Sequence, residues 1–188
     1  MKDFLFIHIP RTAGTSMVRA LNIKNDSHET AEQKKNKLGS IWNKKFKFAF
    51  VRNPWSRVVS WYNFCKQLNL PPKQKQYYKL PFEQWVLNGL CTHWEISAPK
   101  FNGSHPLNLY EYVMLNGKLI VDYVGRYENL KEDFNKICRK LGISKRCLPH
   151  TYKTSNKNFD YRNFYNSKTK NIVGRRFCKD IELFNYSF

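Results

Sequence analysis

Two short apolar stretches of this chain end at polar turns that lead into segments with helical character. Phe4 to Ile9 precedes the small-residue turn Arg11 to Ser16, and Phe46 to Val51 is bounded by Arg52-Asn53-Pro54. A proline in such a position is typical of the first turn of a helix. Strands that alternate with helices favour an α/β fold in which a central parallel β-sheet is flanked by helices.

The rest of the chain continues this alternation. Helices are expected at Met17–Leu21, Glu29–Leu38, Trp55–Gln67, Phe82–Asn88, Leu130–Leu141 and Ser167–Phe177, a third strand at Leu119–Val124, and a long loop over residues 90–109. In parallel α/β folds, ligands bind at the carboxyl ends of the strands. The polar turns after Ile9 and Val51 are therefore the first candidates for a functional site.

Composition points to one ordinary globular domain with a strong positive charge. The chain has 188 residues, 41% of them hydrophobic and 16% aromatic, which is too many core-formers for a disordered chain and predicts a single domain over 1–188. Its 33 basic and 14 acidic residues give a net charge of +19. Such a charge indicates either a polyanionic partner, such as nucleic acid, an acidic glycan or a phosphorylated nucleotide, or a lysine-rich solvated surface.

Several classes of protein are disfavoured. No stretch reaches the ~20 apolar residues that span a bilayer, and the N-terminal apolar stretch is too brief for a signal peptide, so a cytoplasmic location is expected. The five cysteines contain no CxxC pair, which predicts reduced thiols and no metal site. Aromatic residues interleaved with lysines could stack on bases, but no nucleic-acid-binding signature accompanies them. Their placement within expected strands and helices favours core packing and no nucleic-acid partner.

The turn from Arg11 to Ser16 has the composition of an anion cradle. Consecutive N–H groups at a helix start bind phosphate or sulfate, Thr15 and Ser16 can add hydroxyl donors, and Arg11 can clamp an anion bidentately. The turn is not a Walker A loop, because GxxxxGK[ST] is absent. A plain strand–helix turn with a threonine N-cap is the alternative.

The second turn offers a guanidinium and a hydroxyl. Arg52 leaves the end of the expected strand, and Ser60 lies eight residues further on, two helical turns along. Together they could hold a second phosphate. Taken alone, they could equally be a surface arginine and a helix serine that pack for unrelated reasons.

Together, the two motifs resemble the carbohydrate-type sulfotransferases that use 3′-phosphoadenosine 5′-phosphosulfate (PAPS). In that family the first loop reads IPKTGGTS or IPRTAGTS, and the second signature reads FxFVRNPWxRxxSxY. The similarity covers nearly the whole chain. It continues through Val124–Leu130, Leu148-Pro149-His150 with Ser155, Tyr161 and Tyr165, and Asp180–Tyr186.

The resemblance implies a P-loop-like three-layer fold, a single sulfotransferase domain and PAPS as the co-substrate. It places the 5′-phosphosulfate in the first loop and the 3′-phosphate at Arg52 and Ser60. The implied loop residues are Arg11, Thr12, Ala13, Gly14, Thr15 and Ser16. Many members have lysine in place of Arg11 and glycine in place of Ala13; arginine keeps the charge but cannot shuttle a proton as lysine can.

His28 is the expected catalytic base. It stands where related sulfotransferases with an HxxA-like segment carry their catalytic histidine, and imidazole suits proton transfer near neutral pH. Glu29 is a rival base. His8 is expected to be a packed core residue, His93 and His105 fall in the 90–109 loop, and His150 is expected to position the segment that follows.

The basic, hydroxylic segment around Ser155 either closes over the co-substrate or is an ordinary solvated charge run. Acceptor contacts are expected between Thr92 and Asn108. The sequence therefore predicts O-sulfation of a hydroxyl by Arg11 and His28 without a metal, and the resemblance implies a carbohydrate acceptor. A P-loop-related nucleotide kinase and a non-catalytic anion-binding module are the alternatives.

Overall fold

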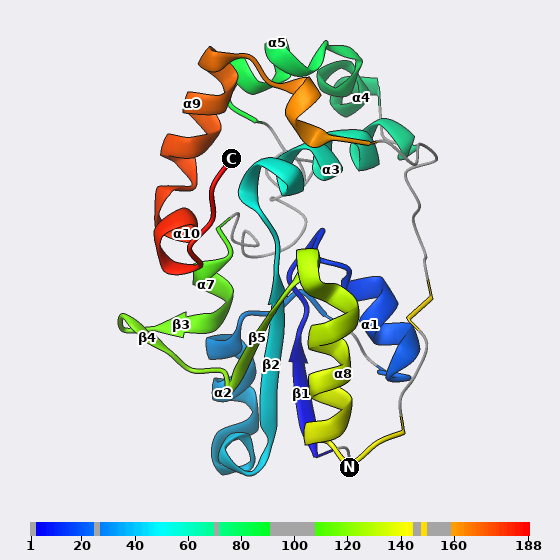
Figure 1. Cartoon of the computed structure of the whole chain (residues 1–188), viewed down its shortest axis with the longest axis vertical. Helices are drawn as coiled ribbons and strands as arrows, with labels where there is room; N and C mark the ends of the chain where they lie inside the picture. Colours follow the sequence, from blue (N-terminus) through cyan, green and yellow to red (C-terminus); the bar gives the residue numbers. More distant parts are fainter. Residues whose placement is uncertain (1–2, 25–26, 70–71, 91–107, 145–147, 150–158) are drawn as a thin grey trace. The chain divides into compact units, whose positions relative to one another are not determined.

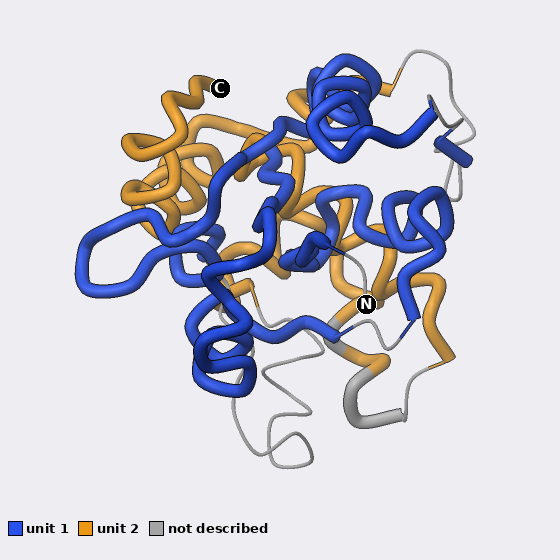
Figure 2. The backbone as a smooth tube through the Cα atoms, turned by 90° about the horizontal axis from the view of Figure 1, so that it is seen from below, with its two compact units in different colours: residues 1–52, 106–157 blue, residues 53–105, 158–188 orange. Residues whose placement is uncertain are grey.

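The computed structural model describes residues 3–24, 27–69, 72–90, 108–144, 148–149 and 159–188. The chain divides into two compact units, residues 1–52 with 106–157 and residues 53–105 with 158–188 (Figure 2). The first unit contains the main β-sheet, and the second is built from helices. The single domain expected from the sequence stays a prediction.

A three-stranded parallel sheet organises the first unit. Its strands are β1 (Phe4–Ile7), β2 (Phe46–Val51) and β5 (Tyr123–Arg126), in the order β1-β2-β5 (Figure 1). Ile7 pairs with Ala49, and Val51 pairs with Arg126. The predicted α/β class with a parallel sheet and helices is confirmed, whereas the P-loop-like character stays a prediction.

The third strand does not begin where the apolar pattern placed it. Leu119 belongs to β4 (Lys118–Leu119), which pairs with β3 (Met114–Leu115) in a small antiparallel hairpin. Asn116 and Gly117 form its turn with positive φ angles of 49° and 75°, the backbone that a two-residue hairpin requires. The predicted strand at Leu119–Val124 was therefore wrong in its bounds, because the turn diverts its first residue into another sheet.

Helices α1 (Gly14–Ala20) and α8 (Leu130–Lys140) cover one face of the main sheet (Figure 1). Side chains from these helices and from β1 and β2 form one buried cluster: Phe6, Met17, Ala20, Leu21, Phe48, Phe50, Phe134, Ile137 and Cys138. The unit also contains α2 (Ala31–Leu38), α7 (Tyr110–Val113) and the short helical turns Gly39–Lys44 and Tyr127–Asn129. The predicted helices at the positions of α1, α2 and α8 are confirmed, with ends displaced by at most three residues.

The close approach of β2 and β5 requires a glycine. Gly125 lies opposite Phe50 in the strand register, and a Cβ on Gly125 would come within 2.6 Å of the Phe50 ring. Phe50 is fully buried. A side chain at position 125 would therefore push the third strand away from the second.

The second unit contains α3 (Pro54–Gln67), α4 (Pro72–Lys79), α5 (Phe82–Leu87), the turn Tyr161–Phe164, α9 (Ser167–Arg176) and α10 (Cys178–Leu183). Asn53 caps α3 by accepting the N–H groups of Trp55 and Ser56, and its own amide donates to the Ser187 carbonyl at 2.7 Å. The helices expected at α3, α5 and α9 are confirmed.

Aromatic packing holds the second unit together. The Trp55 indole donates to the Lys170 carbonyl, the Tyr165 hydroxyl donates to the Trp55 carbonyl, and the Phe188 ring meets both aromatic rings edge-on. Burial raises the pKa of Tyr165 far above its ordinary value, so this phenol remains a hydrogen-bond donor. The expectation that the aromatic residues interleaved with lysines serve core packing is confirmed for Trp42, Phe48 and Phe50 in the first unit.

The predicted loop at 90–109 falls almost entirely outside the described residues, and so do His93, His105 and His150. Within the described ranges, no helix combines the length and apolar character that crossing a membrane requires.

One buried carboxylate ties the end of β5 to α8. Asp133, only 5% exposed, accepts hydrogen bonds from the Tyr123 hydroxyl, the Arg126 N–H and Lys136 Nζ at 2.8–2.9 Å. Burial alone would raise the pKa of Asp133, but these three hydrogen bonds outweigh burial and hold the pKa below its ordinary value. The ionised carboxylate therefore stabilises the fold.

Replacing this carboxylate tests its role. Asp133→Asn is expected to lower the free energy of unfolding at pH 7 by about 1–3 kcal/mol, because buried donors lose a charged acceptor. Since the folded-state pKa lies below the unfolded value of ~3.9, the contribution is complete above that pH and is lost as the pH falls through the folded value. Urea unfolding of both proteins at pH 7 and near pH 3 measures this difference.

Glu132→Gln is the matched control, because Glu132 is the exposed neighbour on the same helix and should change stability by less than about 0.5 kcal/mol. A deficit of Asp133→Asn that is equally large near pH 3 would show that the charge has no part in it.

Candidate functional site

The carboxyl ends of the three parallel strands meet at one edge of the sheet. The turn of residues 10–13 follows β1, Arg52 follows β2 and Tyr127 follows β5. Since Val51 and Arg126 are register partners, the next residues along each strand, Arg52 and Tyr127, emerge side by side. This edge is where parallel α/β folds bind their ligands.

The loop before α1 has an unusual backbone. Arg11 and Ala13 both have left-handed φ angles, 67° and 71°, which non-glycine residues seldom adopt. Such conformations concentrate at functional sites. The family pattern with glycine at position 13 has a physical basis here, because glycine adopts this backbone without strain.

Thr12 does not cap the helix. Ala13 occupies the N-cap position, and no side chain caps α1. Thr12 is fully buried, and its hydroxyl donates to the Ile9 carbonyl at 2.9 Å, so it braces the turn from within. The alternative of a plain turn with a threonine N-cap is wrong in this respect. The Ser16 N–H is one of the amides expected to bind an anion. It donates to the Ala13 carbonyl at 3.0 Å.

His8 contacts both the loop and His28. A Cβ on Gly14 would collide with the imidazole of His8, so the ring occupies the space above Gly14. The ring centroid of His8 also lies 4.2 Å from that of His28, with the planes tilted by 60°. The prediction that His8 is a packed residue is confirmed by its 7% exposure. The sequence did not indicate that its neighbours are two of the predicted site residues.

The backbone sets the orientation of the His28 ring. Nδ1 of His28 lies 3.0 Å from the carbonyl oxygen of His8. Because a carbonyl oxygen only accepts hydrogen bonds, Nδ1 must carry the hydrogen and donate it. In the neutral ring, Nε2 is then the basic nitrogen, which is the tautomer that a general base requires.

Glu29, the rival base, is already engaged. The Ser27 hydroxyl donates to one of its oxygens at 2.7 Å, and Lys37 Nζ donates to the other. The hydrogen bond from Lys37, followed by that from Ser27, holds the pKa of Glu29 below its ordinary value. A carboxylate of lowered pKa is a weaker base. Thr30 then begins α2 with a capping box to Gln33, which fixes the chain just beyond Glu29.

Arg52 joins the two predicted anion-binding motifs. It is 8% exposed, and its Nη1 donates to the Arg11 carbonyl at 3.4 Å. Its guanidinium carbon lies 3.9 Å from the ring centroid of Tyr127. Two motifs that are 41 residues apart in the sequence are thus in direct contact.

Other predicted site residues are placed elsewhere. Ser60 lies on α3 in the second unit and is half-buried, and Ser155 falls outside the described residues. Tyr127 was missed as a site residue, although it stood in a segment that resembles the family. The missing signal was the strand register, which brings Tyr127 beside Arg52.

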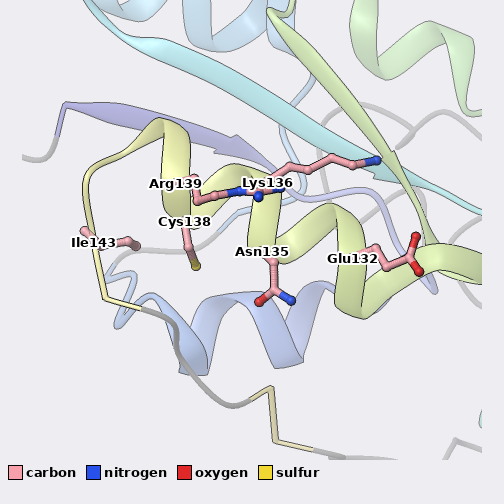
Figure 3. Close-up of a pocket in the computed structure, with 6 residues that line it drawn as sticks. All are labelled: Glu132, Asn135, Lys136, Cys138, Arg139 and Ile143. Atoms are coloured by element: carbon pink, nitrogen blue, oxygen red, sulfur yellow. The ribbon is translucent and has the colours of Figure 1, made fainter.

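A cavity of about 420 Å³ lies along α8 and does not include the predicted site residues (Figure 3). Glu132, Asn135, Lys136, Cys138, Arg139 and Ile143 line it. Within the described part of the chain, no group of three or more His, Cys, Asp or Glu side chains could hold a metal ion.

At the strand-end site of this α/β protein, the loop after β1 contacts the buried guanidinium of Arg52 through the Arg11 carbonyl. A family model described as the sulfotransferase family matches residues 2–187, and the chain belongs to this family. The chain is also 35% identical over 98 residues to an uncharacterised protein of Archaeoglobus fulgidus, over 51% of this chain and 67% of that protein. The recognition of a sulfotransferase from the sequence is confirmed, and with it sulfuryl transfer as the general class of reaction.

Adjacent substitutions in the loop should have opposite effects. Gly14→Ala is expected to lower the free energy of unfolding by about 1–3 kcal/mol, because the added methyl group collides with the buried ring of His8. Ala13→Gly is the matched control. It should be neutral or stabilising by up to about 1 kcal/mol. Glycine removes the strain of the left-handed backbone at position 13, and this gain offsets the larger conformational entropy that glycine gives to the unfolded chain.

Urea unfolding of the two variants beside the wild type measures both effects. Equal destabilisation by both substitutions would contradict the close packing of His8 on Gly14.

Proposed function

We propose that this chain transfers the sulfuryl group from PAPS to a hydroxyl of a carbohydrate acceptor. The observation that carries the proposal is the hydrogen bond between Arg52 and the Arg11 carbonyl, which joins the two motifs that the family resemblance assigns to the two phosphate ends of the co-substrate. Family membership over residues 2–187 supports the sulfuryl chemistry.

The loop of residues 11–16 is proposed to hold the 5′-phosphosulfate. Its left-handed residues turn the backbone sharply into α1, and the positive end of the helix dipole at this N-terminus favours an anion. Arg11, Thr15 and Ser16 add a guanidinium and two hydroxyls. During transfer, negative charge develops on the departing phosphate, and fixed cations and amides stabilise such charge without rearrangement.

The 3′-phosphate is proposed to bind Arg52 and Ser60, with Ser155 as a further contact. A planar guanidinium recognises phosphate through parallel N–H donors. The stacked and hydrogen-bonded guanidinium of Arg52 supports this assignment, because little conformational freedom remains to be lost when the anion binds.

His28 is proposed as the general base. Nε2 takes the proton from the acceptor hydroxyl, the oxygen forms a bond to sulfur, and the sulfur–oxygen bond to the phosphate breaks. The products are a sulfate ester and adenosine 3′,5′-bisphosphate. The donation from Nδ1 to the His8 carbonyl supports this role, and the engagement of Glu29 by Lys37 weakens its rival.

Arg52→Ala is expected to abolish the thermal stabilisation by adenosine 3′,5′-bisphosphate, because only a weak affinity for the rest of the nucleotide remains. At about a hundred times its dissociation constant this nucleotide should stabilise the wild type by ~2.7 kcal/mol, seen as a higher melting temperature. The variant should show no such shift, because the 3′-phosphate loses its guanidinium. Arg175→Ala, which removes an exposed arginine of α9, is the control and should respond like the wild type.

A wild type that is indifferent to the bisphosphate but stabilised by ATP would contradict the proposal. It would support the alternative of a nucleotide kinase.

His28→Ala is expected to reduce transfer of labelled sulfate from PAPS to a glycan pool by roughly 10²–10⁴-fold, the usual contribution of a general base. Its stabilisation by the bisphosphate should remain, because His28 does not hold the nucleotide. Glu29→Gln should retain most of the activity.

A larger loss of activity in Glu29→Gln than in His28→Ala would identify Glu29 as the base. A wild type that binds the bisphosphate but sulfates no hydroxylated acceptor would indicate a non-catalytic anion-binding module.

A further inference from the structure

The ring of Tyr127 forms a platform under Arg52. The strand register places the two residues side by side at the carboxyl edge of the sheet, one step beyond the pair Val51 and Arg126. The guanidinium carbon stands 3.9 Å from the ring centroid, a close cation–π contact. Arg52 is 8% exposed, so this contact is shielded from water.

The contact with the ring does not use the N–H donors of the guanidinium. Stacking occupies one flat face of the group, whereas its N–H donors lie in the plane of the group and point outward from its edge. One donor, at Nη1, is directed to the Arg11 carbonyl at 3.4 Å. The ring and this carbonyl together set both the tilt and the rotation of the guanidinium, which are the two variables that bidentate binding of an anion requires.

The platform itself is anchored. Tyr127 begins the short helical turn Tyr127–Asn129, which runs directly into α8. The preceding residue, Arg126, donates its N–H to the buried carboxylate of Asp133 at 2.8 Å. The backbone that carries the ring is therefore fixed to the main sheet on one side and to α8 on the other.

We propose that Tyr127 is a positioning residue for the 3′-phosphate of the co-substrate, acting through Arg52. Its aromatic face, and not its hydroxyl, orients the guanidinium toward the phosphate. This inference rests on the proposed function and deepens it by adding a residue to the specificity of the site for a 3′-phosphorylated nucleotide.

The test compares two nucleotides that differ only in the 3′-phosphate. Isothermal titration measures the affinity of adenosine 3′,5′-bisphosphate and of adenosine 5′-phosphate for the wild type, Tyr127→Phe and Tyr127→Leu. Tyr127→Phe keeps the ring and should retain the wild-type preference for the bisphosphate. Tyr127→Leu should weaken bisphosphate binding by about five-fold, the typical strength of one cation–π contact, and leave the affinity for the monophosphate unchanged.

A double-mutant cycle separates positioning from packing. In the Arg52→Ala background, Tyr127→Leu should have no further effect on bisphosphate affinity, because the group on which Tyr127 acts is gone. Tyr127→Met is a second ring-removing variant that keeps much of the apolar volume, and it should reproduce the selective loss. Thermal unfolding of each free protein verifies that the variants are folded.

Three results would overturn the inference. Equal losses of affinity for both nucleotides, or a further loss in the Arg52→Ala background, would show that Tyr127 only packs. A Tyr127→Phe variant as weak as Tyr127→Leu would transfer the role from the ring to the hydroxyl. A wild type that does not prefer the bisphosphate to the monophosphate would overturn the proposed function, and this inference with it.

Discussion

β2 pairs in parallel with β1 on one side and with β5 on the other, and the candidate site of the first unit depends on this double pairing. Parallel strands end at the same edge of a sheet. The pairing alone therefore brings together the loop after β1, Arg52 after β2 and Tyr127 after β5. Gly125 permits the close approach of β5 to Phe50, and Asp133 fastens the end of β5 to α8. Gly125 and Asp133 thereby set the position of the Tyr127 ring under Arg52.

Backbone strain and side-chain packing fix the loop of residues 11–16. Two left-handed residues turn the chain into α1, and the buried hydroxyl of Thr12 braces the turn from within. His8 then fills the space above Gly14 and contacts His28, while its carbonyl sets the tautomer of that ring. The proposed base and the proposed anion loop are thus linked through one buried imidazole.

The net charge of +19 has a limited part in this chemistry. The proposed anion site uses the charges of Arg11 and Arg52, and Lys37 engages Glu29. Many of the other lysines and arginines of the described helices, such as Lys131, Lys140 and Arg175, are exposed. Surface charge of this kind steers anionic molecules toward a protein but does not select among them.

The sequence by itself determined the α/β class, the two strand–turn–helix units and the family, because apolar periodicity and the motif residues are local properties of the chain. It misplaced the third strand, because the Asn116-Gly117 turn redirects Leu119 into a separate hairpin. Only the tertiary structure decided that Tyr127 lies against Arg52, that His8 contacts both Gly14 and His28, and that Lys37 engages Glu29. The contacts of Tyr127 and His8 depend on strand register and packing between segments far apart in the chain, which no local pattern of residues encodes.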